Sequence, residues 1–202
     1  MTVLDFLSPS LARDEGGFHP VARSAAERVF AAAGALFDER DGWRVPTVVP
    51  EEDTHLEAVG IADLSHLGKL EVRPAPDSPG LTVYRLSPRR ALVLYPGSER
   101  AAVVQGLAGA RLLLDVTAAY TVLAVTGSEA RTLIARLTHL HQFPSGGEVA
   151  HVTAHVLPSG EGFRILVAQE LGHYLAEVAL DRAQALGGGL VGVDALPETE
   201  RA

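Results

Sequence analysis

The chain contains no cysteine, and only one methionine and one tryptophan, in 202 residues. Without cysteine, disulfide bonds, thiolate metal ligands and a cysteine nucleophile are all excluded. This composition fits a chain that stays in a reducing compartment, so we expect a cytoplasmic location.

Long apolar runs and an excess of positive charge are also missing. No uncharged apolar run reaches the roughly 18 residues that a membrane-spanning helix needs. Asp5 and Pro9 flank a short apolar run near the N-terminus, which predicts that it is not a signal peptide. The net charge is -8 and the pI is near 5.4, so the chain repels phosphate backbones. We therefore expect neither a membrane nor a nucleic acid as a partner.

Hydrophobic residues make up 47% of the chain, enough to build a core. Residues 19–37 carry apolar side chains at three- and four-residue spacing, which predicts a helix that ends before Asp41 and Gly42. The following segment, "GWRVPTVVP", predicts an extended connector because each proline disfavours helix in its predecessor. Its Trp43 either plugs the edge of the core or lines a cleft, and we favour the plug.

From Lys69 onward the apolar spacing predicts two α+β units. In the first, strands at residues 70–72, 81–86 and 91–96 precede a helix after Ser98 and a strand at 111–116. The second has the order β-α-β-β-α-β, the split βαβ or ferredoxin-like unit. Its expected elements are strands at 120–126, 148–157, 163–168 and 190–193, with helices from 130 and at 171–186.

The first unit resembles the second with its first helix missing. Only eight residues separate Val72 from Leu81, too few for a packed crossover helix. The predicted fold class is α+β, with two ferredoxin-like modules of which the first is trimmed. The expected divisions are an N-terminal helix and connector (1–50), the trimmed module (51–118), the second module (119–196) and a tail (197–202).

A polar cluster of Asp63, Ser65 and His66 precedes the first of these strands. A nucleophile, base and orienting acid could be drawn from it, but such triads are assembled from distant segments. Neither an oxyanion hole nor a G-x-S-x-G elbow accompanies the cluster. We favour the plainer interpretation, in which Asp63 and Ser65 bond local backbone N–H groups.

Two pairs of histidines could hold a metal through their imidazoles: His139 with His141, and His151 with His155. On one strand, His151 and His155 would share a face. No carboxylate lies at a diagnostic spacing, so solvated histidines on a strand face are the plainer interpretation and no metal ligand is assigned.

Glu161 lies in the Gly-flanked turn "SGEG" between two expected strands, where a carboxylate can project into a cleft or into solvent. The run "GGG" at 187–189 follows a helix, so it predicts a helix end and not a phosphate-binding loop.

Several segments together resemble the aminomethyltransferase (glycine cleavage T-protein) family, which includes folate-binding domains of sarcosine and dimethylglycine oxidases. The most specific is "HLEAVGIADLSHLGKLEV" (55–72), which is similar to a family segment ending in D-x-S-H-x-G-K/R. "GWRVP" (42–46), the "VYRL" strand (83–86), "LAVTGSEARTLIARL" (123–137) and the "SGEGF" hairpin (159–163) follow in the family's order. The resemblance runs from about residue 19 to about 196.

The resemblance implies a central cavity between two modules that binds tetrahydrofolate. Within it, Glu161 corresponds to the hairpin carboxylate that the family directs at the pterin, and Tyr84 to the "VYRL" tyrosine beside the same cavity. The family's Asp-Ser-His segment is not used as a triad.

The departures from the family pattern are as informative as the match. "PAPDSPG" (74–80) replaces the family's helix and its catalytic Asp-Asp turn, and Asp77 does not correspond to either acid. The hairpin is one residue shorter and has Arg164 where the family has Glu. The family's third, C-terminal barrel domain is not expected either. No catalytic residue is therefore assigned.

A short chain of this type is similar to the gamma subunit of heterotetrameric sarcosine oxidase. We expect a non-catalytic subunit or accessory protein of one-carbon amine metabolism, in an oligomer or with a larger oxidase or transferase subunit. The alternatives are an active tetrahydrofolate-dependent aminomethyltransferase and a stand-alone binding module.

Overall fold

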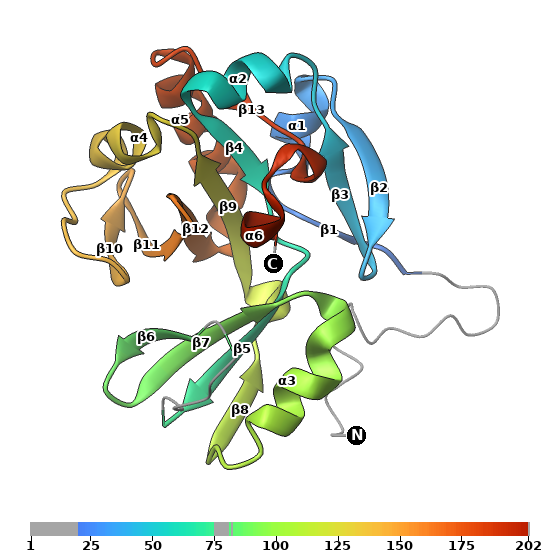
Figure 1. Ribbon diagram of the computed structural model, residues 1–202, viewed down its shortest axis with the longest axis vertical. Helices are drawn as coiled ribbons and strands as arrows, with labels where there is room; N and C mark the ends of the chain where they lie inside the picture. The colour runs from blue at the N-terminus through green and yellow to red at the C-terminus, as the bar shows by residue number, and fades with distance from the viewer. Residues whose placement is uncertain (1–19, 75–80, 82, 202) are drawn as a thin grey trace.

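The computed structural model describes residues 20–74, 81 and 83–201. The chain forms an upper part that contains a six-stranded and a three-stranded sheet, and a lower part with a four-stranded sheet and one helix (Figure 1). No helix of the described residues is long and apolar enough to cross a membrane.

The N-terminal segment is mostly β-structure, so the helix predicted over residues 19–37 is wrong. Only α1 (Glu27–Ala32) is helical, and it ends before Gly34, whose φ of 80° leaves the helical region. The three-stranded sheet has the order β1-β3-β2 and consists of β1 (Ala22–Arg23), β3 (Trp43–Val48) and β2 (Leu36–Arg40).

Asp41 and Gly42 form the turn between β2 and β3. Both have positive φ, 52° and 75°, as a two-residue hairpin of the primed type requires. The expected connector is therefore strand β3, and Arg40 pairs with Trp43 across the turn. Trp43 is buried in the core, which confirms the plug interpretation.

The six-stranded sheet has the order β10-β11-β12-β9-β4-β13. Its strands are β4 (Gly60–Asp63), β9 (Tyr120–Thr126), β10 (Ser145–Val149), β11 (Val152–Ser159), β12 (Gly162–Ala168) and β13 (Gly189–Leu190). Strand β4 lies between β9 and β13 and precedes the lower sheet in the chain. This long-range pairing brings the start of the D-L-S-H-L-G-K segment into the upper part.

The segment predicted as one strand over residues 148–157 is a hairpin. Ala150 and His151 have φ of 49° and 66° and form the turn between β10 and β11. His151 therefore lies on a turn, and the prediction that it shares a strand face with His155 is wrong.

The four-stranded sheet has the order β6-β7-β5-β8, and all its neighbouring strands are antiparallel. Its elements follow the predicted β-β-β-α-β order: β5 (Gly68–Arg73), β6 (Val83–Ser87), β7 (Arg90–Tyr95), α3 (Arg100–Gly106) and β8 (Leu112–Asp115). The expectation that no helix lies between β5 and β6 falls largely on residues 75–80 and 82, outside the described residues.

The buried residues form one core cluster on each face of the six-stranded sheet and a third beneath α3. Helices α4 (Ala130–Leu137) and α5 (Gly172–Gln184) pack on the outer face of that sheet. The other face meets the lower part through a cluster that includes Trp43, Tyr84, Leu92 and Leu166, which we call the inter-sheet core. Shorter helices are α2 (Glu52–Ala58) and α6 (Glu198–Arg201), with 3-10 turns η3 (Gly97–Glu99), η4 (Thr117–Ala119), η5 (Gln169–Leu171) and η6 (Val193–Ala195).

Gly192 provides a test of how tightly the C-terminal segment packs on β3. A Cβ at Gly192 would lie 2.0 Å from the backbone oxygen of Thr47, although its φ of -74° is ordinary. We expect Gly192→Ala to lower the free energy of unfolding in urea by about 2 kcal/mol or more, because a backbone atom must move. Gly109→Ala is the control, since its Cβ would meet nothing within 4 Å and should change stability by less than about 1 kcal/mol. Equal effects at both positions would contradict the packing.

Candidate functional site

Asp63 Oδ1 and Ser65 Oγ are engaged in structural hydrogen bonds, whereas Asp63 Oδ2 is buried and has no hydrogen-bond partner among the described residues. The Asp63 Oδ1 accepts from the Ser65 hydroxyl and, at 2.9 Å, from its backbone N–H. The Ser65 Oγ in turn accepts from the Val122 N–H at 3.1 Å and from the Ser24 hydroxyl at 3.2 Å. No hydrogen bond joins His66 to either residue in the described part of the chain. The local-bonding interpretation is confirmed for Asp63, whereas the backbone N–H that Ser65 bonds belongs to Val122 of the distant strand β9; the geometry of a catalytic triad is not formed.

Lys69, the only lysine of the chain, lies next to this pair and is fully buried. Its Nζ donates to three backbone carbonyls: Ser65 at 2.9 Å, Leu67 at 2.8 Å and Thr117 at 2.9 Å. Three acceptors match the three N–H donors of an ammonium group. We call this arrangement the carbonyl cage.

Burial shifts the ionisation of all three groups around the cage. It raises the pKa of Asp63, with the hydrogen bonds from Ser24 and Ser65 opposing the shift. It lowers the pKa of His66 from 6.5 to about 4, helped by the positive charges of Lys69 and Arg40. It lowers the pKa of Lys69 from 10.5 to about 7, against the attraction of Asp63 and Asp115. Because all three cage carbonyls accept at 2.8–2.9 Å, the geometry fits the charged form of Lys69.

Tyr84 lies in the inter-sheet core with 7% of its surface exposed. Its neighbour there is Arg164 of β12, which is among the largest fully buried side chains. Burial lowers the pKa of the Arg164 guanidinium, and the hydrogen bond to Tyr84 and the charge of Glu200 oppose the shift. Arg164 also donates from Nη2 to the Glu200 carbonyl of α6 at 3.1 Å. Figure 1 shows α6 close to the chain crossings between the upper and lower parts.

Glu161 lies at the tip of the β11–β12 hairpin and is exposed. Gly160 beside it has a φ of 55° and packs against α6, because its Cβ would meet Glu200 at 2.9 Å. Tyr84 is therefore buried between the sheets, whereas Glu161 is at the surface. Four hollows of the described surface have volumes of about 330–480 Å³, and neither residue lines any of the four.

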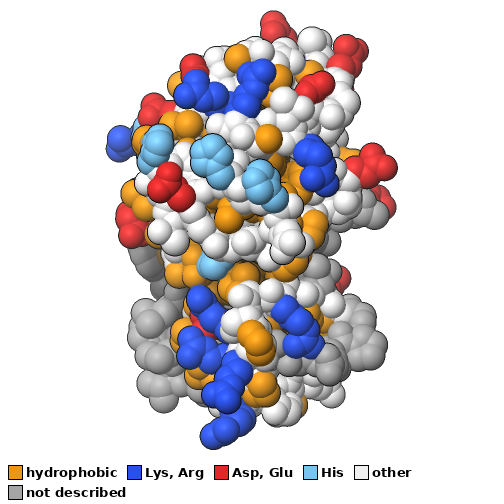
Figure 2. Space-filling view, turned by 90° about the vertical axis from the view of Figure 1, so that its left-hand side faces the viewer, with side chains coloured by type: hydrophobic (Ala, Val, Ile, Leu, Met, Phe, Trp, Pro, Cys, Tyr) orange, Lys and Arg blue, Asp and Glu red, His pale blue; other side chains and the backbone are white. Residues whose placement is uncertain are grey.

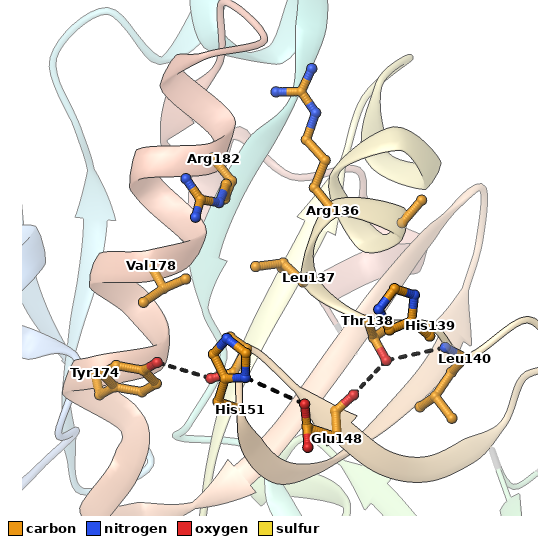
Figure 3. Close-up of a pocket in the computed structure, with 12 residues that line it drawn as sticks. Arg136, Leu137, Thr138, His139, Leu140, Glu148, His151, Tyr174, Val178 and Arg182 are labelled. Atoms are coloured by element: carbon orange, nitrogen blue, oxygen red, sulfur yellow. Dashed lines mark hydrogen bonds and ion pairs between the residues drawn. The ribbon is translucent and has the colours of Figure 1, made fainter.

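Histidine side chains gather on one face of the upper part (Figure 2). His139 and His151 line a hollow of about 390 Å³ between α4, α5 and the β10–β11 turn (Figure 3). His151 Nδ1 lies 3.4 Å from the Glu148 carboxylate, and Tyr174 donates to the Ala150 carbonyl at 2.9 Å.

The other two histidines of the predicted set do not line this hollow. His155 lines a second hollow together with His151, and His141 is exposed. No group of three or more metal-ligating side chains is present among the described residues.

The burial of Lys69 and Arg164 in the core was not predicted from the sequence. One feature of the sequence could have indicated that Lys69 is special: it is the only lysine in a chain that otherwise uses arginine. The signal for Arg164 was its place inside "FRILVA", where a strand in the middle of a sheet has both faces covered.

Comparison with solved structures identifies the fold class. The aminomethyltransferase T of the glycine cleavage system from Bartonella henselae superposes with a TM-score of 0.68 at 19% identity, covering 87% of this chain and 60% of that chain. A chain of the heterotetrameric sarcosine oxidase from Corynebacterium sp. U-96, in complex with pyrrole 2-carboxylate, superposes with a TM-score of 0.60 at 18% identity. The latter match covers 85% of this chain and 99% of that chain.

No family model and no curated protein sequence matches the chain. The structural likenesses nevertheless show that it has the aminomethyltransferase-like folate-binding fold, as the sequence motifs implied. The chain spans 60% of the length of the aminomethyltransferase chain that it matches.

The carbonyl cage predicts a large effect of removing the Lys69 ammonium. In Lys69→Met, three buried carbonyls lose their donors while the side-chain length is kept. We expect urea unfolding to show a loss of about 3 kcal/mol or more. Arg136→Met is the control, because Arg136 is exposed and makes no ion pair with a described residue. A Lys69 variant as stable as this control would exclude the cage as a stabilising element.

The lowered pKa of His66 predicts that the free energy of unfolding decreases as the pH falls below neutrality. Its pKa is lower in the folded chain than in the unfolded chain, so the unfolded chain binds more protons between about pH 4 and 6.5. Stability should therefore fall as the pH is lowered through this window, by about 2 kcal/mol between pH 7 and pH 5 from His66 alone. His66→Gln should remove this part of the difference, and His141→Gln, an exposed control, should keep it. An unchanged pH difference in His66→Gln would contradict the assignment.

Proposed function

We propose that the chain is a non-catalytic subunit or accessory protein of one-carbon amine metabolism. The structural likeness to a sarcosine oxidase chain supports this proposal, because the match covers 99% of that oxidase chain. That oxidase is heterotetrameric, so its chain works in contact with other subunits. The proposed partner is a larger oxidase or transferase subunit, and the proposed contact is the surface near Val72 and Leu81.

The buried Arg164 is the observation that carries the proposal. The sequence resemblance to the transferases implies that Tyr84 corresponds to a tyrosine beside a ligand cavity between the modules. Here the buried guanidinium of Arg164 lies beside Tyr84, and its interaction with Tyr84 raises the pKa of Arg164 against the effect of burial. The Glu200 carbonyl of α6 accepts a further bond from the same guanidinium. These two contacts hold the guanidinium between Tyr84 and α6, in the region where the family places its ligand.

For the fold, we propose that the chain consists of two ferredoxin-like modules. The strand order β6-β7-β5-β8 is that of a split βαβ unit, numbered 2-3-1-4 within the unit. The upper sheet has the same order in β11-β12-β9-β13, with β4 inserted between the last two strands and β10 added at the edge. On this proposal the modules correspond to residues 51–118 and 119–196, apart from β4.

An active tetrahydrofolate-dependent aminomethyltransferase is the alternative. Transfer of a one-carbon unit at a folate nitrogen needs a group that manages the proton, and the family's Asp-Asp turn is missing from the sequence at 74–80. A stand-alone binding module is the third possibility. The neighbouring genes discriminate between these functions. Genes for oxidase subunits beside this one favour the non-catalytic subunit, and a gene for a lipoyl-carrier protein favours the active aminomethyltransferase.

Calorimetric titration of the full chain with tetrahydrofolate tests the site. We expect weak binding or none, because Arg164 and Tyr84 engage each other, and no aminomethyl transfer from a lipoyl-carrier substrate. If weak binding is measured, Glu161→Ala should reduce it. Glu170→Ala, which removes another exposed carboxylate, should not.

Two results would refute the proposal in different ways. Turnover with the lipoyl-carrier substrate would show an active transferase. Binding of tetrahydrofolate with a Kd below about 1 µM, without turnover, would show a working ligand site and contradict the role of Arg164.

A further inference from the structure

Within residues 20–74 and 83–201, strand β8 is an edge of the lower sheet without the usual protection against pairing. Among the described residues it pairs with β5 alone. At the opposite edge, β6 carries the exposed Arg85 and is followed by Pro88 and Arg89, features that discourage strand addition. On β8, Leu112 and Leu114 are instead 40% and 47% exposed, and both lie on the face of the sheet away from α3.

The sequence of β8 is complementary to itself. It reads Arg-Leu-Leu-Leu-Asp from Arg111 to Asp115. When two copies pair antiparallel about Leu113, each Arg111 lies opposite the Asp115 of the other copy. Directly opposite residues in such a pair have Cβ atoms about 5 Å apart, so opposite charges attract there.

Of the two charges, Arg111 is already at the surface, whereas Asp115 has to turn outward to make this pair. Arg111 is exposed and makes no ion pair with a described residue. The Asp115 Oδ1 accepts from the Thr117 N–H at 2.9 Å, and its Oδ2 is buried 3.8 Å from Arg100, so the pairing exchanges this long contact for one with Arg111 of the other copy. In the same register, Leu112 lies opposite Leu114 of the other copy, so the exposed leucines cover each other.

Helix α3 next to this edge has an uncharged outer surface. Between Arg100 and Arg111 the chain carries no charged residue. The exposed positions in this stretch are small or neutral: Ala101, Ala102, Gln105, Gly106, Ala108 and Gly109. Figure 1 shows α3 and β8 side by side in the lower part. A second copy paired through β8 would place its own α3 across the seam, where small side chains allow close approach.

We propose that two copies of this chain associate through β8, in antiparallel register about Leu113, to form a two-fold dimer with one continuous eight-stranded sheet. The interface is isologous, because each copy uses the same strand and the same pair of charges. This inference does not depend on the proposed function, since it uses only the edge strand and its neighbours.

Light scattering and analytical ultracentrifugation of the full chain test the dimer. We expect a dimer at concentrations of roughly 10–100 µM that dissociates on dilution. Arg111→Glu places two carboxylates opposite each other on both sides of the two-fold axis, and should weaken the dimer about tenfold or more. Arg89→Glu makes the same charge change at the other end of the sheet and should leave the dimer unchanged.

A mixing experiment tests the register itself. Asp115→Arg alone should also weaken the dimer. An equimolar mixture of the Arg111→Glu and Asp115→Arg chains should restore it, because every opposing pair is then again of opposite charge. Asp115 also accepts from the Thr117 N–H, so circular dichroism must first show that its variant is folded. Leu114→Glu is the second variant, and it places a carboxylate in the apolar part of the seam without removing a hydrogen bond.

The dimer proposal is overturned by any of three results. These are a monomer at roughly 100 µM, equal weakening by Arg111→Glu and Arg89→Glu, and a Leu114→Glu chain that dimerises as tightly as the parent.

Discussion

The carbonyl cage around Lys69 connects the two places where the chain crosses between the upper and lower parts. Ser65 and Leu67 belong to the β4–β5 crossing, and Thr117 belongs to the β8–β9 crossing. Two backbone hydrogen bonds also connect these crossings. The Val116 N–H donates to the Lys69 carbonyl, and the Leu64 N–H donates to the Val122 carbonyl. A fully buried cation is tolerated only where hydrogen bonds replace its hydration. The relative placement of the two sheets therefore depends on three carbonyls converging on one side chain.

The same layer contains further buried charges that are engaged within the chain. Arg164 meets Tyr84 and α6, and Glu71, with only 6% of its side chain exposed, pairs with Arg73 and with Arg90 at 2.9 Å. In this aminomethyltransferase-like fold, Arg164 and Tyr84 are therefore both buried between the two sheets. Chemistry at a folate nitrogen would require those groups to exchange their partners for a ligand.

Much of this architecture was predictable from residue spacing, and the failures have identifiable causes. Period-two alternation located the strands of the lower sheet, and the D-L-S-H-L-G-K motif pointed to the fold. The prediction of a long N-terminal helix was wrong. The alanine-rich spacing fits a helix, but Gly34 ends the helix and the following residues pair with β3 as a strand. The β10–β11 turn was missed because Ala150 and His151 are not the residues that usually adopt positive φ. The insertion of β4 beside β9 and the contact of Arg164 with Tyr84 join distant segments, which local patterns do not encode.

The role of Arg164 is best tested by an experimental structure of the chain with excess folinate, which is a stable analogue of the folate cofactor. We expect Arg164 to remain beside Tyr84 and bonded to the Glu200 carbonyl, with no pterin between the sheets. A pterin ring in the inter-sheet core, with Arg164 displaced or bound to it, would contradict the account.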